Sequence, residues 1–402
     1  MPLHISIQVP VYQFSEFTEF RFPRFRIFNQ SIIETMQRSV TLSLKRASSL
    51  AGRAFSSHAI DVHTHMYTPK YMNILKKRTD IPRVINIDGS DRLVILPGED
   101  KEKSTNIGRP IGKEYFDVEA KLRFMDIHGI EKSVISLANP WLDFLTGKEA
   151  ESVAQELNDE LQEICHKSNG RLYGFATLPV RNPKASIKEI QRLSSSKLIK
   201  GVILGTPGAG KGIDHDNMFD VLGEIEKNDY TIFLHPHYGI GNEHWHDTGH
   251  SLFLALGFPF ETTVAVSRLI VTGRLDKLPK LKLLVAHAGA ALPALIGRLD
   301  SCVYHDIAIA NRLQHAPNVY LKRMYFDAIS YNTSSLQNLI DIVGEDRIMF
   351  GTDNPFFPPP GEKDIFNTVW PSTKKVFSSI DALPGKISSQ IYSDTAKKLL
   401  KL

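Results

Sequence analysis

Eight short apolar runs, rich in β-branched residues, alternate along the chain with stretches of helical periodicity. The runs cover residues 59–63, 132–138, 172–178, 199–205, 230–235, 281–287, 324–329 and 347–352. The helical stretches cover residues 117–128, 148–168, 183–195, 216–227, 261–276 and 334–343. Near-continuous apolar strands separated by helices indicate a parallel sheet that is covered on both faces. Eight such units predict an α/β fold, a distorted (β/α)8 TIM barrel.

An open, doubly wound parallel sheet is the alternative fold. It is disfavoured because no Gly-x-Gly-x-x-Gly motif follows the first strand. Residues 66–116 are too long and polar for an ordinary connection and include Pro82, Pro97 and Pro110. We therefore expect an inserted segment over the mouth of the barrel after strand one.

The first 58 residues differ in composition from the rest of the chain. Residues 36–58 contain arginine and lysine, no acidic residue and many serines and alanines, which is typical of a mitochondrial transit peptide. Residues 1–35 contain glutamates and many aromatic residues, which suits a transit peptide poorly. The prediction is an N-terminal extension at 1–58, either a transit peptide or a disordered tail, and one domain at 59–402. A cytoplasmic protein is expected, with mitochondrial import as the alternative.

Composition excludes several classes of protein. The net charge of +4 is small for 402 residues and does not indicate a nucleic-acid partner. No apolar run approaches the roughly 18 residues that span a bilayer, so no membrane partner is expected. The only two cysteines, Cys165 and Cys302, are too few for a disulfide framework and fit a reducing compartment.

Metal-ligating residues occur at the ends of four of the predicted strands. His63 and His65 end the first strand and point to the same side of it, because side chains at i and i+2 of a strand do so. His235, His287 and Asp353 follow the fifth, sixth and eighth strands. Single histidines at strand ends are often structural, but in a barrel these ends form one face, where active sites lie. Three imidazoles and a carboxylate there suit a zinc site with an open position.

The motifs DVHTH, LHPH, AHAG and GTDNPF resemble those of the amidohydrolase-related decarboxylases, the group that includes the aminocarboxymuconate semialdehyde decarboxylases. The longer phrases SVISLANPWLDFL, KGVILGTPGAGKG, FLHPHYG and GTDNPFFPP resemble the fungal uracil-5-carboxylate (isoorotate) decarboxylases more closely. The resemblance covers roughly residues 59–402 and implies a metal-dependent carboxy-lyase with a barrel fold.

The resemblance also implies roles for single residues. The metal ligands would be His63, His65, His235 and Asp353. Asp353 and His287 would be the catalytic residues, with His287 beside the metal rather than among its principal ligands. The substrate would contact Arg109, Asn139, Phe356 and Arg298. Arg298 would reach the carboxylate, either within the chain or from the neighbouring subunit of the homodimer that the resemblance implies.

Two positions refine this expectation. The isoorotate pattern has histidine directly after the metal aspartate, whereas this chain has Asn354, which bears on substrate choice. Hydrolases with two metals use a lysine at the end of strand four, where this chain has Gly205 and Thr206, and Lys200 lies at the opposite end of that strand. One metal ion per chain is therefore expected. Zinc is the leading prediction, and three histidines and one aspartate also suit Mn²⁺ or Fe²⁺.

Decarboxylation at an sp² carbon needs a group that accepts negative charge and a proton for the ring carbon. A divalent metal meets the first need as a Lewis acid. Asp353 is the expected general acid, with His287 as the rival donor, and no redox cofactor is implied. The leading prediction is a zinc-dependent decarboxylase that converts uracil-5-carboxylate to uracil. Aminocarboxymuconate semialdehyde as substrate, a mononuclear hydrolase and a binding protein on a degenerate barrel are the alternatives.

Overall fold

The structure of the protein is a computed structural model that describes residues 58–95, 99, 108–245 and 248–402. The predicted N-terminal extension therefore lies outside the described residues, apart from His58. The fold described below is that of the domain predicted at residues 59–402.

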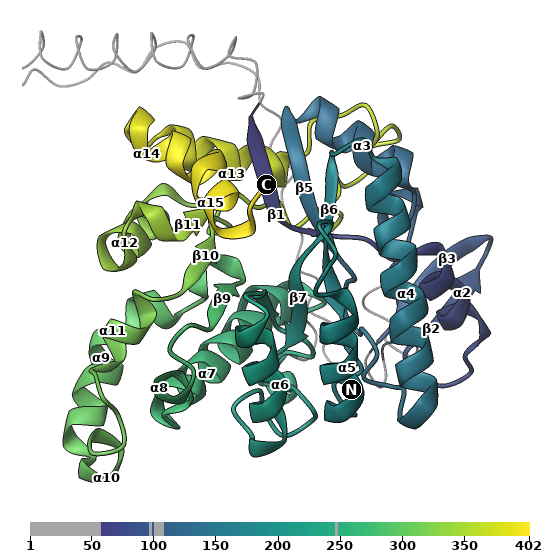
Figure 1. Ribbon diagram of the computed structural model, residues 1–402. Coiled ribbons are helices and arrows are strands. Elements are labelled where there is room, and N and C mark those ends of the chain that lie inside the picture. The colour runs from purple at the N-terminus through teal and green to yellow at the C-terminus, as the bar shows by residue number, and fades with distance from the viewer. Residues whose placement is uncertain (1–57, 96–98, 100–107, 246–247) are drawn as a thin grey trace, which may run out of the picture. The chain divides into compact units, whose positions relative to one another are not determined.

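Eight parallel strands form one sheet in the order β1, β5, β6, β7, β8, β9, β10 and β11 (Figure 1). Their bounds are β1 Ala59–His65, β5 Ile130–Ser136, β6 Leu172–Thr177, β7 Ile199–Gly205, β8 Thr231–His235, β9 Lys282–Val285, β10 Tyr325–Asp327 and β11 Ile348–Met349. Each observed strand falls on one of the eight predicted apolar runs. The runs identify the strands because a parallel sheet buried on both faces is made of continuous apolar segments.

The last strand returns to the first, so the sheet is a nearly closed barrel. The amide of Val62 donates to the carbonyl of Phe350 (3.0 Å), and that of Asp353 donates to the carbonyl of His63 (2.8 Å). The amide of His65 donates to the carbonyl of Asn354 (2.7 Å). These bonds form a seam between β1 and the segment that follows β11. The predicted (β/α)8 barrel is confirmed, and the open-sheet alternative is wrong.

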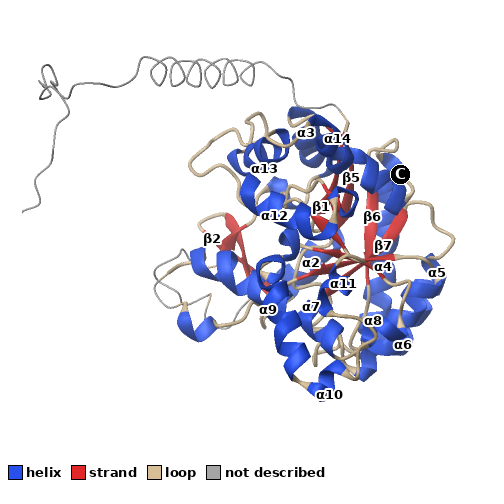
Figure 2. Ribbon diagram, turned by 90° about the vertical axis from the view of Figure 1, so that its left-hand side faces the viewer, coloured by secondary structure: helices blue, strands red, loops and turns tan. Residues whose placement is uncertain are grey.

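Helices surround the strands, which lie inside a ring of helices in Figure 2. Their bounds are α3 Val118–Ile127, α4 Gly147–Lys167, α5 Pro183–Leu193, α6 Asp216–Lys227, α7 Phe258–Val271, α8 Arg274–Lys277, α9 Leu292–His305, α10 Ile307–Ala310, α11 Pro317–Leu321, α12 Thr333–Val343, α13 Pro371–Asp381, α14 Gly385–Ser389 and α15 Thr395–Leu400. Side-chain caps start several of them: Asp117 accepts from the amide of Ala120, and Asn332 from that of Ser335.

Three details differ from the sequence expectation. The stretch 261–276 is two helices, α7 and α8, because Gly273 adopts a left-handed conformation between them (φ 70°). Helices α9 and α13 were not predicted. The sixth strand ends at Val285, so His287 lies in a turn after β9 with a φ of 57° rather than in the strand itself.

The inserted segment folds as helix α2 Pro69–Lys77 and a small antiparallel sheet of β2 Arg83–Ile87, β3 Ser90–Val94 and β4 Arg109–Pro110. The start of the segment is fixed to the loop after β5, because the Tyr67 hydroxyl donates to the carbonyl of Asn139 (2.7 Å). At the other end of the segment, Arg109 lines the cavity at the barrel mouth. The insertion thus flanks that mouth.

The helical segment Phe253–Val271, which includes α7, is long and apolar enough by length and composition to cross a membrane. The segment contains Glu261 and Arg268, so it is not an uninterrupted apolar run of the kind that the sequence lacks. Its length and composition are weak evidence for a membrane span, since buried helices of barrels have the same composition. Val266, Leu269 and Ile270 of this segment pack in the hydrophobic core.

Candidate metal centre

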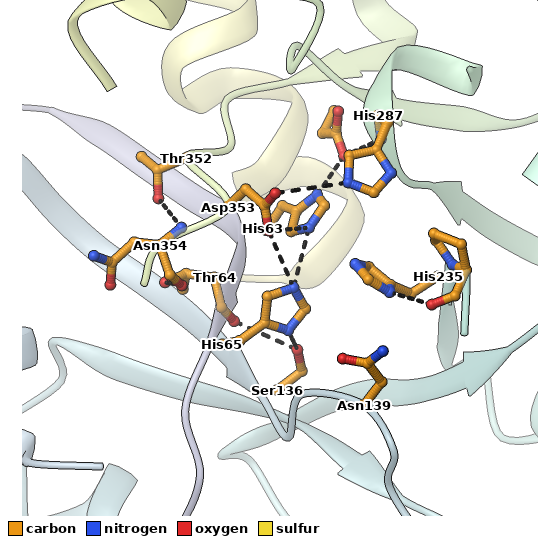
Figure 3. Close-up of polar contacts among 12 residues, drawn as sticks. His63, Thr64, His65, Ser136, Asn139, His235, His287, Thr352, Asp353 and Asn354 are labelled. Atoms are coloured by element: carbon orange, nitrogen blue, oxygen red, sulfur yellow. Dashed lines mark hydrogen bonds and ion pairs between the residues drawn. The ribbon is translucent and has the colours of Figure 1, made fainter. Parts of the chain in front are cut away.

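Four side chains from β1, β8 and the segment after β11 converge at the carboxyl end of the barrel (Figure 3). His63, His65, His235 and Asp353 are all buried, and one ligand atom of each lies within 4.8 Å of the others. His63 Nε2 is 3.1 Å from His65 Nε2 and 3.3 Å from Asp353 Oδ1. In the described part of the chain, no other group of at least three histidine, cysteine or acidic residues meets this criterion.

Each histidine of the cluster uses Nδ1 for a hydrogen bond and turns Nε2 toward the others. Nδ1 of His63 contacts Asp327 Oδ2 (2.6 Å), that of His65 contacts Ser136 Oγ (2.9 Å), and that of His235 contacts the Pro236 carbonyl (2.7 Å). Such contacts fix the ring orientation and the tautomer of a metal-binding histidine. Neither Asp327 nor Ser136 is among the residues predicted from the sequence. The available signal for Asp327 was an acidic residue inside an apolar strand.

The electrostatics of the cluster favour metal-binding protonation states for three of its members. Burial lowers the pKa of His65 to about 4 and holds that of His235 well below its usual range. Burial would raise the pKa of Asp353, but the neighbouring histidines, His63 foremost, hold it well below the usual value. Burial lowers the pKa of His63, but the charges of Asp327 and Asp353 have a larger, opposite effect and raise this pKa to about 10. His63 must therefore release its proton when a metal binds.

The donor set fits a single small divalent ion. Donors at about 2.1 Å from a tetrahedral ion lie about 3.4 Å apart. The 3.1, 3.3 and 3.6 Å among His63, His65 and Asp353 are close to this value, whereas the set that includes His235 lies within the wider limit of 4.8 Å. Nε2 of His235 is buried and has no hydrogen-bond partner in the described part of the chain. An unsatisfied imidazole nitrogen aimed at three other donors is explained by a metal ligand role.

A cavity of about 970 Å³ opens over the cluster. Most of the predicted site residues line it: Arg109, Asn139, His235, His287, Asp353 and Phe356. The Arg109 guanidinium lies over the Phe356 ring, 5.6 Å from its centroid. His287 Nε2 is 3.7 Å from Asp353 Oδ2, so this histidine lies beside the cluster rather than in it. Apolar residues near the starts of α7 and α9, such as Leu254 and Pro293, form much of the remaining wall.

Arg298 and Asn354 lie elsewhere. Arg298 is an exposed residue of α9 and is not part of the cavity lining. Asn354 is buried and does not line the cavity either, because its side chain accepts a hydrogen bond from Lys121. Asn354 is therefore not part of the wall of this cavity.

Glu261 at the start of α7 positions the loop after His235, a role that the sequence analysis missed. Its buried carboxylate accepts the amides of His237 (3.1 Å) and Gly239 (2.5 Å) and the hydroxyl of Thr206. The main-chain carbonyl of His237 in turn accepts from the side-chain amide of Asn139 (2.9 Å). One buried carboxylate thus links the loops after β7 and β8, and through them the cavity residue Asn139.

Comparison with known proteins identifies the protein family to which this fold and site belong. The amidohydrolase family profile matches residues 60–402, so the chain belongs to the amidohydrolase family. The crystal structure of isoorotate decarboxylase (IDCase) from Metarhizium anisopliae is 38% identical, with a TM-score of 0.82, and the match covers 85% of this chain and 97% of that one.

Curated relatives are decarboxylases by name. Gamma-resorcylate decarboxylase of a Rhizobium species is 31% identical over 268 residues, 62% of this chain and 80% of the relative. The 2-amino-3-carboxymuconate-6-semialdehyde decarboxylase of Dictyostelium discoideum is 25% identical over 319 residues, 75% of this chain and 82% of the relative. The predicted family and the predicted class of enzyme, a carboxy-lyase, are confirmed.

Proposed function

We propose that the protein is a decarboxylase with one metal ion per chain that converts uracil-5-carboxylate to uracil and carbon dioxide. The buried cluster of three histidines and Asp353, facing a cavity that Arg109 lines, is the observation that carries this proposal. The 38% identity to isoorotate decarboxylase favours the pyrimidine substrate over the muconate semialdehyde, whose named decarboxylase is 25% identical.

In the proposed reaction, the bond between the ring carbon and the carboxylate carbon breaks. Its electron pair stays on the ring carbon, which takes up a proton, and carbon dioxide leaves. A divalent ion in the cluster would supply Lewis-acid stabilisation of the charge on the substrate oxygens. Asp353 is the proposed proton donor to the ring carbon. Because its low pKa keeps it ionised at rest, it must first take up a proton, and His287, whose Nε2 lies 3.7 Å from Asp353 Oδ2, is placed to pass one to it from the cavity.

Arg109, Asn139 and Phe356 orient the substrate. A guanidinium binds a carboxylate through two parallel hydrogen bonds, which suits Arg109 to an acidic ring. Phe356 offers an aromatic face for a planar pyrimidine, and its ring is 5.6 Å from that of His65. Replacing Arg109 with methionine should raise the KM for the substrate much more than it lowers kcat.

The direct test is incubation of the metal-loaded protein with 5-carboxyuracil, with uracil followed by chromatography and evolved carbon dioxide measured. A parallel panel contains aminocarboxymuconate semialdehyde and 2,6-dihydroxybenzoate. Uracil formation that is lost in His235→Ala supports the proposal. Turnover of another acid without uracil formation would show that the proposed substrate is wrong. Hydrolysis without release of carbon dioxide would show that the proposed reaction, decarboxylation, is wrong.

We propose zinc as the bound ion, because zinc prefers imidazole and carboxylate donors and the separations among His63, His65 and Asp353 are close to those of its tetrahedral coordination. Manganese and iron suit the same donors. The 5-carboxyvanillate decarboxylase of Novosphingobium aromaticivorans, which shares the fold at 22% identity and a TM-score of 0.68, was solved with manganese. Elemental analysis of protein purified without added metal, followed by reconstitution with each ion, decides among them.

We also propose that the protein acts as a homodimer. Helix α7 carries the exposed apolar side chains Phe260 and Val264, and α9 carries Leu295, which lies one turn before the exposed Arg298 on the same helix. Sedimentation analysis should give twice the chain mass, and Leu295→Asp should shift it toward the monomer. In the dimer, Arg298→Ala should raise the KM if this residue reaches the partner's substrate.

For the location, we propose a cytoplasmic enzyme, with import into mitochondria as the alternative if residues 36–58 act as a transit peptide. Mass spectrometry of the mature N-terminus distinguishes the two, because import removes the transit segment.

A further inference from the structure

A lysine on α3 is completely enclosed by the protein, although none of the roles assigned above uses it. Lys121 is 1% exposed. Lysine is almost never fully buried unless an opposite charge pairs with it, because removing an ammonium from water is costly. In the described residues Lys121 forms no ion pair within 4 Å, and its hydrogen-bond partners are neutral oxygens. A buried charge of this kind needs a functional or structural explanation.

The contacts of Lys121 lie at the seam where the barrel closes. Its Nζ donates to Thr64 Oγ1 (2.7 Å) and to both the main-chain and the side-chain oxygen of Asn354. The Thr64 hydroxyl donates to the Asn354 carbonyl (2.9 Å), and Figure 3 shows these two residues together beside the cluster. Thr64 stands between His63 and His65, and Asn354 follows Asp353. The Lys121 Nζ atom therefore contacts residues that are adjacent in sequence to three of the four metal donors, His63, His65 and Asp353.

Asp61 supplies the opposite charge in the same buried region. Its carboxylate accepts the amide of His63 (3.1 Å) and the hydroxyl of Thr352 (2.6 Å), so it also joins β1 to the segment after β11. Burial lowers the pKa of the Lys121 ammonium, and the charges of Asp61 and Asp353 oppose that shift. The Thr352 hydroxyl also accepts the amide of Asn354 (3.1 Å), whose side chain accepts from Lys121, so Asp61 and Lys121 belong to one buried network that does not line the cavity.

We propose that Lys121 is a positioning residue for the metal centre, which ties Asn354 to Thr64 and so holds Asp353 at a fixed separation from His63 and His65. The inference rests on the proposed metal-dependent function. It also gives Asn354 a role, since its side-chain oxygen accepts a hydrogen bond from Lys121 Nζ. Partners of this kind, one step removed from the metal, change metal affinity by about 10- to 100-fold when they are removed.

The test uses Lys121→Met, which keeps the length of the side chain and removes the donor. Metal-free protein is titrated with Zn²⁺ against a coloured chelator, so that affinity is measured without the reaction. We expect about 10- to 100-fold weaker binding, a smaller rise in Tm on zinc addition, and recovery of kcat at excess zinc with unchanged KM. Arg123→Met on the same helix is the control, because the exposed Arg123 contacts only Asn367 in the described residues and should leave zinc affinity unchanged.

If Lys121→Met does not fold, the double variant Asp61→Asn/Lys121→Met removes both buried charges together, and Asn354→Ala removes the acceptor alone. Both should weaken zinc binding. A lower Tm with zinc affinity equal to that of the wild type would overturn the positioning role and leave Lys121 a structural residue. A wild-type protein that binds no zinc, manganese or iron would overturn the proposed metal-dependent function as well.

Discussion

Asp327 fixes the ring orientation of His63 and raises its pKa, although the two residues are 264 positions apart in the sequence. Its carboxylate oxygens accept the His63 ring nitrogen and the amides of His287 and Ala288. A single side chain of β10 thus orients one metal-binding imidazole and the turn that carries His287. The hydrogen-bond partners of metal-binding residues strongly affect the affinity of a site for its metal.

Replacing Asp327 with asparagine should therefore weaken metal binding by about 10- to 100-fold. The amide keeps the shape of the side chain but loses the charge that holds the His63 ring. Metal per chain after dialysis and chelator competition measure the effect. Asp341→Asn, at an exposed position of α12, is the matched control. Equal metal retention in both variants would rule out the orienting role of Asp327.

The buried His128 predicts a pH dependence of stability that is separate from the metal centre. Its Nδ1 contacts the Phe124 carbonyl (2.8 Å), its Nε2 accepts the Trp370 amide (2.9 Å), and burial lowers its pKa from 6.5 to about 4. Below pH 6.5 the histidine of the unfolded chain binds a proton, whereas His128 in the folded protein stays neutral until the pH approaches 4. The free energy of unfolding therefore decreases as the pH falls from 6.5 toward 4.

Between pH 7 and pH 5, the wild type should lose about 2 kcal/mol more unfolding free energy than His128→Gln. Urea unfolding of both proteins at the two pH values measures the difference. Equal losses would mean that His128 is protonated as easily in the folded protein as in the unfolded chain.

At the scale of elements, close contact between strands requires small residues at defined positions. Gly351, two residues after the end of β11, faces the strand that carries His63 and His65. A Cβ atom at this position would lie 2.8 Å from the Cβ of His63 and 3.3 Å from that of Asp327. These neighbours are attached to the backbone and cannot move aside as the end of a long side chain can.

Gly351→Ala should therefore displace His63, reduce metal retention and destabilise the fold by about 1 to 3 kcal/mol, as overpacking of a core does. Metal content and urea unfolding report the two effects. Gly297→Ala on α9 is the control, since its added Cβ meets no atom within 4 Å and should raise stability by up to about 1 kcal/mol through helix propensity. A stable, fully metallated Gly351→Ala protein would contradict the close approach.

The elements that could be predicted from the sequence are those with a strong local signal. All eight strands were located, because burial on both faces makes each an apolar run. The ligand set could be predicted because its histidines end β1 and β8 and Asp353 closely follows β11. Asp327, Ser136, Lys121 and Glu261 were missed, since each acts through a contact distant in sequence and none lies in a recognisable motif. Arg298 was expected at the substrate, and in the single chain it is exposed on α9.

For the whole molecule, the metal would act as a bridge between distant parts of the barrel. Its donors come from β1, β8 and the segment after β11, so bound metal opposes separation of the first and last strands. A ligand that binds only the folded state stabilises it by about 2.7 kcal/mol when its free concentration is 100 times its Kd.

Removal of the metal with a chelator should therefore lower Tm while the far-ultraviolet circular dichroism of the folded barrel persists at low temperature. His235→Ala should show little further decrease with chelator, because one of its four donors is already missing. A wild-type Tm that does not respond to chelator or to added zinc would contradict the bridging role.

The seam between β1 and the segment after β11 also has a consequence for biosynthesis. The two histidines of β1 leave the ribosome near the start of the domain, whereas Asp353 emerges only after seven further barrel strands and most of the helices. A nascent chain therefore lacks the complete ligand set until the barrel is nearly finished. Bound metal would mark molecules whose folding is complete, and a fragment ending before β11 would lack the carboxylate ligand.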